Sequence, residues 1–403
     1  MATLEITGIS SSTSLNITIN TFVGVTARDL YVWGAQLEQS STVGQYVKTT
    51  TAINSAPRFD HDPTTGESLG LLVEESRTNQ ITYSEDFEDT SWSKFNVSIT
   101  GTSSVSPDGS TNATEFTPSS ANSRVYVGLT TAGDTDHTFS VFAKAGTGQF
   151  VTLRSIGYGT DTTVGFDLVG GTAQSGGIIT DFGNGWYKCS MTFDTNGDRV
   201  GQPSIYLATT LGGYSGDVGE TFYLWGAQLE KGSFPTSYIP TEGLEFTRAA
   251  DVASISGTNF SSWYRQDEGT VLELYSHIGA VGSNNGLFNM HNSSAPTNNR
   301  HTIRAGNYSV TTAGVTQANT SYAIPADGVL GRLAYAYETN NIAITKPVDQ
   351  VILSDTSATL PSGIDTFEIG KVESTSLQLD GTIRRLTYWP TRLSNDTLQT
   401  ITT

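Results

Sequence analysis

The chain has 403 residues, which is enough for two or three domains of about 150 residues each. Its 39 acidic and 21 basic residues give a formal net charge of −18, and charged residues make up 15% of the sequence, against about 25% in average proteins. An acidic chain without a basic run is a poor partner for nucleic acid or an anionic membrane surface. Nucleic acid is therefore not expected as a partner.

Three features that the sequence lacks exclude further classes of protein. No stretch approaches the roughly 18 consecutive apolar residues of a membrane-spanning helix, so no membrane insertion is expected. The N-terminal residues lack the basic region and the apolar core of a secretory signal. Cys189 is the single cysteine, which excludes an intrachain disulfide, and its alternating surroundings predict a small buried side chain.

An internal repeat marks the beginning of the chain. Residues 30–38 (LYVWGAQLE) recur as residues 222–230 (FYLWGAQLE), Tyr46 matches Tyr238, and Arg58 falls near the equivalent of Arg248 with a two-residue shift. The second copy follows well over 100 residues of predicted strands, whereas the first follows about 30 residues. Because a complete β-sandwich needs roughly seven strands, residues 1–57 are predicted to be a partial β-module. An element of a partner chain or of the downstream domain would complete it.

Beyond this segment, short alternating runs between turn residues predict strands. Residues 58–79 contain Pro63 and several turn-forming residues, and are expected to be a connector that leads into a short buried strand. Alternation then recurs at 138–143, 150–153, 204–207 and 221–225. A short helix is expected at the C-terminus, with Ser394 as N-cap and with Leu398 and Ile401 on one face. The predicted fold class is all-β, with tandem β-sandwiches.

Three motifs in the sequence resemble those of bacteriophage tail-fibre and other virion structural proteins. They are GLLVEESRTN at 70–79, YSEDF at 83–87 with Trp92, and LWGAQLE at 224–230. In that family, a jelly roll similar to carbohydrate-binding modules precedes a laminin-G-like (concanavalin A-like) sandwich. The resemblance implies that RAAD at 248–251 is the junction between the two modules. It also implies the division into a partial module (1–57), a connector (58–79), a jelly roll (80–247) and a laminin-G-like sandwich (248–403).

Candidate catalytic residues are few. The five histidines show no zinc-ligand spacing, and His61 between Asp60 and Asp62 is the one local acid–histidine cluster. No Gly-x-Ser-x-Gly nucleophile motif is present. A glycoside hydrolase needs two facing carboxylates, and Glu273 in its alternating strand has no second acid two or four residues later. The chain is therefore expected not to be an enzyme.

Two kinds of binding site are predicted. Asp194, Asn196 and Asp198 place oxygen atoms at alternate positions of a turn, as calcium loops do. The alternative is an Asn-Gly hairpin turn with solvated acids, and no cofactor other than this structural calcium is expected. Tyr158 (GYG) and Tyr214 (GGYSG) stand between glycines in loops. Both are predicted to be presented to carbohydrate, with a role as loop anchors as the alternative.

The sequence and the resemblance together favour a virion structural protein: a tail fibre, a tail-associated protein or a head-decorating fibre. Its sandwiches would lie on the virion surface and adhere to host surface glycans, and the N-terminal segment would bind other virion proteins. A homo-oligomer is expected from the resemblance, a trimer above all. Two alternatives stay open: a glycan depolymerase, and a decoration protein without a ligand.

Overall fold

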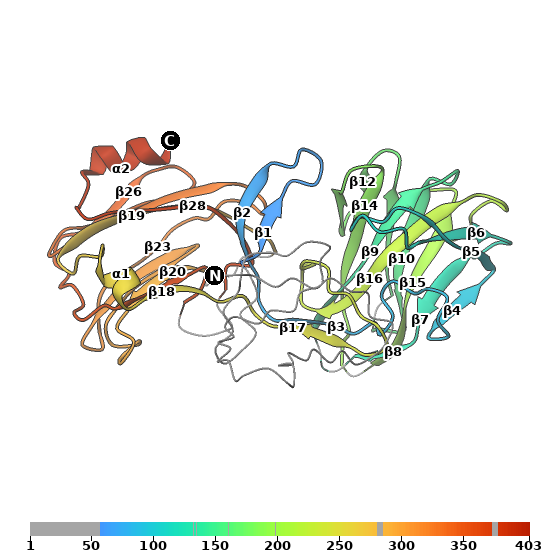
Figure 1. Cartoon of the computed structure of the whole chain (residues 1–403), viewed down its shortest axis with the longest axis horizontal. Coiled ribbons are helices and arrows are strands. Elements are labelled where there is room, and N and C mark those ends of the chain that lie inside the picture. The colour runs from blue at the N-terminus through green and yellow to red at the C-terminus, as the bar shows by residue number, and fades with distance from the viewer. Residues whose placement is uncertain are drawn as a thin grey trace, which may run out of the picture. The chain divides into compact units, whose positions relative to one another are not determined.

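The computed structural model describes residues 57–403, except residues 132, 134, 160, 198, 280–284 and 373–377 and the side chains of residues 102 and 103. Strands dominate this part of the chain and form two β-sandwiches (Figure 1). The prediction of an all-β chain with tandem β-sandwiches is confirmed. The partial module at 1–57, with the first copy of the repeat, lies outside the described residues.

The first sandwich has two mainly antiparallel sheets. One has the order β12-β11-β10-β15-β7-β4, with β8 beside β15, and the other has the order β13-β14-β9-β16-β6-β5. The strands are β4 (Trp92–Phe95), β5 (Val97–Ser104), β6 (Ala113–Pro118), β7 (Arg124–Val127), β8 (Leu129–Thr131), β9 (Asp136–Ala145), β10 (Phe150–Ile156), β11 (Thr162–Asp167), β12 (Thr172–Ala173), β13 (Gly177–Asp181), β14 (Trp186–Asp194), β15 (Arg199–Ala208) and β16 (Phe222–Lys231).

Alternation along the strands builds the core of this sandwich. On β10, Val151 and Leu153 are fully buried between the sheets, while Thr152 and Arg154 point to the other face. Cys189 on β14 lies in the same core, as its alternating surroundings predicted, and burial raises the pKa of its thiol. The core is therefore the product of a period of two, which the sequence shows directly.

The second sandwich also has two sheets, with the orders β1-β2-β28-β19-β24-β25-β26 and β18-β27-β20-β21-β22-β23. The strands are β1 (Phe59–His61), β2 (Ser68–Val73), β18 (Ala253–Ser256), β19 (Glu268–His277), β20 (Gly286–His291), β21 (Arg300–Arg304), β22 (Asn307–Thr312), β23 (Val315–Ser321), β24 (Gly331–Glu338), β25 (Ile342–Thr345), β26 (Ile352–Asp355), β27 (Thr366–Ile369) and β28 (Gly381–Trp389).

Two helices accompany the second sandwich: α1 (Thr258–Ser261) and α2 (Asn395–Thr402). The predicted C-terminal helix is confirmed as α2, because the Ser394 hydroxyl accepts the N–H of Thr397 at 3.2 Å and thereby caps the first turn. Leu398 of α2 is fully buried against Leu272 of β19. The helix thus covers the outer face of the sheet that contains β19.

The segment 58–79, predicted to be a connector, contributes strands to the structure. Its hairpin β1-β2 pairs with β28 and so extends a sheet of the second sandwich, although it precedes the first sandwich in the sequence. The next strand, β3 (Arg77–Asn79), pairs with β17 (Phe246–Arg248), which follows the first sandwich. The chain therefore leaves the second sandwich, forms the first, and returns beside its own path.

A bulge in β16 holds the 70–79 motif against the 224–230 motif. Gly226 has a positive φ of 62°, and the register with β9 shifts between Trp225 and Gln228. The side chain of Asn79 fills this irregularity: its amide nitrogen donates to the carbonyls of Ala227 and Ile239, at 3.2 and 2.9 Å, and its oxygen accepts the N–H of Leu229 at 3.2 Å. The bulged strand therefore keeps its polar backbone groups bonded.

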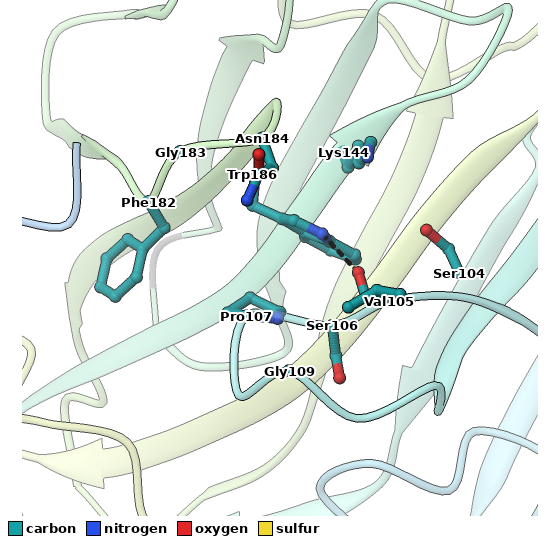
Figure 2. A pocket seen from close by; sticks show the side chains of 10 residues that line it. All are labelled: Ser104, Val105, Ser106, Pro107, Gly109, Lys144, Phe182, Gly183, Asn184 and Trp186. Carbon is teal, nitrogen blue, oxygen red and sulfur yellow. Dashed lines mark hydrogen bonds between the residues drawn. The ribbon is translucent and has the colours of Figure 1, made fainter.

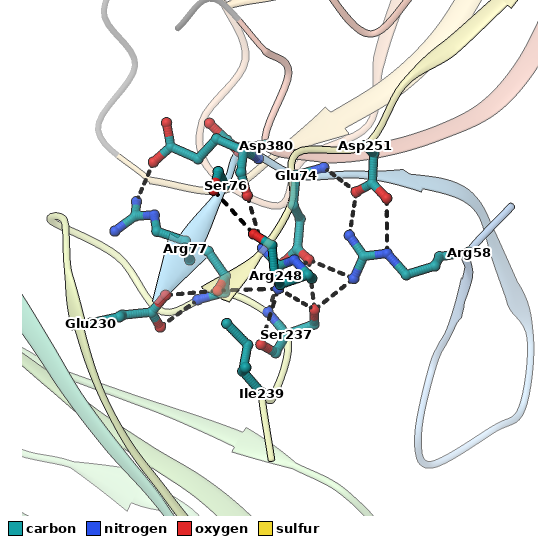
Figure 3. A network of polar contacts seen from close by, with 12 residues as sticks. Arg58, Glu74, Ser76, Arg77, Glu230, Ser237, Ile239, Arg248, Asp251 and Asp380 are labelled. Atoms are coloured by element: carbon teal, nitrogen blue, oxygen red, sulfur yellow. Dashed lines mark hydrogen bonds and ion pairs between the residues drawn. The ribbon is translucent and has the colours of Figure 1, made fainter. Parts of the chain in front are cut away.

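A second network surrounds the buried carboxylate of Glu74, directly after β2 (Figure 3). Its Oε2 lies 2.9 Å from Nη1 of Arg58 and 3.1 Å from Nη1 of Arg248. Its two oxygens accept the backbone N–H and the hydroxyl of Ser237, at 2.7 and 2.6 Å. Asp251 completes the network, because it pairs with Arg58 and accepts the backbone N–H of Glu74 at 2.8 Å.

These contacts have two consequences. Burial works to raise the pKa of Glu74, but Arg248, Ser237 and Arg58 outweigh it, so the pKa lies below its ordinary value. The two arginines that the repeat relates, Arg58 and Arg248, also share one carboxylate and one hydroxyl, that of Ser237. The RAAD motif therefore acts together with Glu74 of the 70–79 motif.

We expect Glu74→Gln to lower the free energy of unfolding by about 3 kcal/mol at pH 7, because it leaves Arg248 without a carboxylate and Arg58 with Asp251 alone. The lowered pKa means that this contribution is present above pH ~4.5 and is lost as the pH falls. Urea melts at pH 7 and pH 3.5 measure it, and the gap between the two proteins should shrink at the lower pH.

The matched control is Glu67→Gln, which removes the exposed ion pair of Glu67 with Arg384. Exposed pairs contribute about 0–1 kcal/mol, so this variant should melt close to the unchanged protein. Equal melts for the Glu74 and Glu67 variants would contradict the importance of the buried network.

Candidate functional site

The outer face of the sheet β4-β7-β15-β10-β11 brings arginines and aromatic rings together. The inward residues of these strands are Val125, Ile205 and Leu153 and their alternating neighbours, so the remaining side chains point away from the core. Register places them in two adjacent rows. The first row contains Phe95, Arg124, Tyr206, Thr152 and Gly165, and the second contains Ser93, Tyr126, Ser204, Arg154 and Thr163.

Arg124 lies at the centre of this surface. Its guanidinium carbon is 5.2 Å from the ring centroid of Phe95, 5.1 Å from that of Tyr126 and 5.3 Å from that of Tyr206, which is within the range of cation–π attraction. Its Nη1 donates to the hydroxyl of Tyr206 at 2.7 Å. Three rings and one hydrogen bond therefore fix the orientation of this cation.

Tyr214 extends the surface from the loop that follows β15. Its ring lies 5.0 Å from that of Tyr206, and the guanidinium of Arg154 lies 5.2 Å from its centroid. The loop can rest on the sheet because Gly165 has no side chain: a Cβ there would overlap the backbone of Gly212. The structure thus places the predicted residue Tyr214 on a surface that holds five further residues. We call Phe95, Arg124, Tyr126, Arg154, Tyr206 and Tyr214 the aromatic–arginine face.

Exposure decides what this face can do chemically. Phe95 is 44% exposed and Tyr214 is 36% exposed, whereas Tyr206 beneath them is 2% exposed. Two rings are thus open to solvent above a buried one, with a guanidinium beside each. Open rings offer stacking area, and guanidinium groups offer fixed hydrogen-bond donors. Such a surface is suited to a flat, polar ligand with hydroxyl or acidic groups.

The prediction that Tyr158 is presented to carbohydrate is wrong, because its side chain is not exposed. Tyr158 is fully buried, its ring stacks on Phe193 at 5.1 Å, and its hydroxyl donates to the carbonyl of Leu129 at 3.0 Å. Gly201 leaves the space for it, because a Cβ at that position would overlap the Tyr158 ring. Tyr158 is therefore the loop anchor that the sequence left as the alternative.

The sequence did not single out the other five residues of the aromatic–arginine face. A signal was present, since Arg124 and Tyr126 alternate with Val125 and Val127 on one short strand. Charged and aromatic side chains at alternate strand positions indicate an outer face that can bind a ligand, rather than one that only keeps the protein soluble. The sequence gives no way to tell that Phe95 and Tyr206 are the neighbours of that strand.

The turn predicted to bind calcium uses its polar groups internally. The carboxylate of Asp194 accepts the backbone N–H of Asn196 at 2.8 Å, and Asn196 and Gly197 have positive φ angles of 48° and 98°. This is the geometry of a tight polar turn. Asp198 lies outside the described residues, and within them no cluster of three or more His, Cys, Asp or Glu side chains could hold a metal ion. Calcium at this turn stays a prediction.

The other acids that the sequence singled out lie on separate elements, the hairpin β1-β2 and strand β19. Asp60 and Asp62, on either side of His61, accept backbone N–H groups of their own hairpin, and Asp62 binds those of Thr64 and Thr65 at 2.9 and 2.8 Å. Glu273 is fully buried between the sheets of the second sandwich, without a hydrogen-bond partner, and burial raises its pKa to about 8. The one acid considered for hydrolysis is thus sealed from solvent.

A pocket of about 380 Å³ lies over the other sheet of the first sandwich (Figure 2). Trp186 of β14, Lys144 of β9, the loop residues Phe182 and Asn184, and Ser106 line it. The indole of Trp186 offers little stacking area, because this residue is 2% exposed and its Nε1 donates to the carbonyl of Val105 at 2.9 Å. The pocket is therefore a second candidate site, lined by polar and apolar groups alike.

Among the described residues, no helix is long and apolar enough to cross a membrane.

Comparisons with known proteins yield only remote structural similarity. No family model and no curated protein sequence matches the chain. The chain is similar to the NanB sialidase of Streptococcus pneumoniae (17% identity, TM-score 0.29), over 37% of this chain and 26% of the sialidase, or about a quarter of its length. It is also similar to the LG4-5 domains of the mouse laminin alpha1 chain (12%, TM-score 0.27), over 65% of this chain and 85% of the other. A third similarity is to the CBM22-1–CBM22-2 tandem of Xyn10C from Paenibacillus barcinonensis (10%, TM-score 0.26), over 77% and 98%.

We expect the buried Glu273 to make the protein less stable as the pH rises. Its folded-state pKa of about 8 lies above the ordinary 4.5, so the folded state holds a proton that the unfolded state releases between these values. Glu273→Leu should remove this pH-dependent loss of stability. The free energy of unfolding of the variant, relative to that of the unchanged protein, should therefore grow by about 3 kcal/mol between pH 5 and pH 8. Denaturant melts at both pH values measure the difference.

Burial also raises the pKa of Asp380, to about 7. Asp380 therefore adds the same pH dependence of stability to the unchanged protein and to the Glu273→Leu variant. The difference between the two stabilities thus reports on Glu273. The exposed Glu245 supplies the control variant Glu245→Leu, for which the pH dependence should stay that of the unchanged protein. A Glu273→Leu advantage that is constant with pH would show that the carboxyl is not held protonated.

Proposed function

We propose that this chain is a non-enzymatic carbohydrate-binding protein, and that the aromatic–arginine face of its first sandwich binds the sugar. The single observation that carries the proposal is the pair of open rings, Phe95 and Tyr214, set beside two oriented guanidinium groups. Aromatic rings bind the C–H faces of sugars, while nearby donors bind the hydroxyl groups.

The chemistry of the face favours a sugar over an apolar ligand. Around the rings lie the hydroxyls of Thr163 and Tyr214, 3.4 Å apart, and the guanidinium of Arg154, whose Nη2 pairs with Asp161 at 2.8 Å. A purely apolar ligand would remove these polar groups from water without replacing their hydrogen bonds to water, which costs free energy. A ligand that has both apolar faces and hydroxyls satisfies both parts of the surface.

Absence of catalysis is part of the proposal. Hydrolysis of a glycosidic bond uses two carboxyl groups that flank the bond. On the aromatic–arginine face, the carboxylate of Asp161 is engaged by Arg154, while Glu273 is buried in the other sandwich. These placements support a binding protein over a depolymerase, and a polysaccharide cleavage assay with the intact chain distinguishes the two.

The proposal extends to the place of the protein. The motifs at 70–79, 83–87 and 224–230 resemble those of bacteriophage virion proteins, and we infer a position on the outside of the particle. There, several copies would raise the strength of weak single sites, and residues 1–57 would attach the chain. Antibodies against residues 58–403 should label the exterior of purified particles, and particles that lack this chain would refute this part.

We expect Tyr214→Ala and Phe95→Ala each to weaken sugar binding about tenfold, because each removes an open stacking ring. Binding is measured on a glycan array and then, for a positive glycan, by titration calorimetry of the intact chain.

Two controls separate this face from other surfaces. Phe59→Ala removes a still more exposed ring from β1 of the second sandwich, and binding should persist. Lys144→Ala alters the pocket of Figure 2. Loss of binding with Lys144→Ala but not with Tyr214→Ala would move the site to that pocket.

A further inference from the structure

We infer that the ligand of the aromatic–arginine face is an acidic glycan, and that Arg124 binds its anionic substituent. The inference rests on the proposed function and adds the chemical class of the sugar. It starts from the charge balance around Arg124, which differs from that of the arginines in the Glu74 network.

Arg124 has no carboxylate partner among the residues that the structure describes. Its one hydrogen bond to a side chain is the bond from Nη1 to the hydroxyl of Tyr206, and its Nε is buried without a partner. Three other shielded arginines are paired: Arg58 with Glu74 and Asp251, Arg77 with Glu75, and Arg248 with Glu74. A shielded cation without a counter-ion is costly, and here a ligand can supply the counter-ion.

The acidic composition sharpens this contrast. With 39 acidic against 21 basic residues, carboxylates are in excess, yet the row that contains Arg124 and the adjacent row that contains Tyr126 have none. They hold rings, hydroxyls, a glycine and Arg154. These two rows therefore hold no group that would compete with an anionic ligand for Arg124, and the nearby carboxylate of Asp161 is paired with Arg154.

The geometry also holds the cation ready for an anion. Three rings surround the guanidinium at 5.1–5.3 Å, so little side-chain freedom is lost on binding. The rings leave Nη2 without a hydrogen bond to any described residue. A carboxylate or sulfate that accepts from Nη2 would complete a charge-assisted hydrogen bond, while the open rings of Phe95 and Tyr214 hold the sugar on either side.

Arg154, whose charge is paired with that of Asp161, adds hydrogen-bond donors near Arg124. It lies on β10, two strands from Arg124 on β7, which corresponds to roughly 10 Å across the sheet. The overall charge of −18 repels polyanions at long range, but the Debye length at physiological salt is about 8 Å. Distant carboxylates are thus screened, while the direct contact with Arg124 is not.

The test compares matched polysaccharides on the intact chain at 150 mM salt. The panel contains alginate, polygalacturonate and polysialic acid, each also in its carboxyl-reduced form, together with dextran sulfate and dextran. Carboxyl reduction removes the charge but keeps the backbone. We expect binding to acidic members, and a loss of tenfold or more on carboxyl reduction or in Arg124→Gln. Arg124→Lys should retain part of the preference.

The control is Arg199→Gln, which makes the same charge change at an exposed position of the same sandwich and should leave the preference unchanged. Preference for dextran sulfate would assign a sulfate, and preference for a polyuronate or polysialic acid would assign a carboxylate. Binding that Tyr214→Ala abolishes but that is equal for acidic and reduced forms would overturn this inference and leave the proposed function standing. Failure to bind any member of the panel or any glycan on the array would overturn both.

Discussion

The buried carboxylate of Glu74 is the constraint on which the arrangement of the chain depends. It receives Arg58 from the segment before the first strand, and Ser237 and Arg248 from the segment after the first sandwich. A carboxylate this deeply buried is stable only when it is fully paired, so these segments have to meet at one point. The hairpin β1-β2 can then join the second sandwich, while the chain between β3 and β17 forms the first.

The bulge at Gly226 is the second fixed point, and it depends on the first. Asn79 reaches Ala227, Leu229 and Ile239 because β3 runs directly from the Glu74 network into the first sandwich. The bulged strand β16 presents Trp225, which packs on Phe142 and Tyr238 at ring distances of 5.2 and 4.7 Å. The residues that carry the family resemblance are thus mainly structural, which explains why these motifs say little about a ligand.

The aromatic–arginine face lies away from those motifs, on a sheet held in place by the core of the first sandwich. Its residues can differ without disturbing Asn79 or Glu74, because they point outward from strands whose inner side chains carry the packing. Along each strand, residues that can bind a ligand therefore alternate with residues that pack in the core. Such a division suits a protein whose scaffold is constant and whose ligand varies.

The sequence by itself determined the all-β class, the alternation that defines inner and outer faces, the capped helix α2 and the repeat whose arginines meet at Glu74. Local spacing suffices for these, because a period of two or a cap involves only near neighbours. Tertiary structure decided the rest. Tyr158 and Tyr214 share a glycine-flanked context, yet one is buried beside Gly201 and the other rests on a sheet beside Gly165. Phe95, Arg124 and Tyr206 become neighbours only through pairing of β4, β7 and β15, and such long-range register leaves no trace in the local pattern.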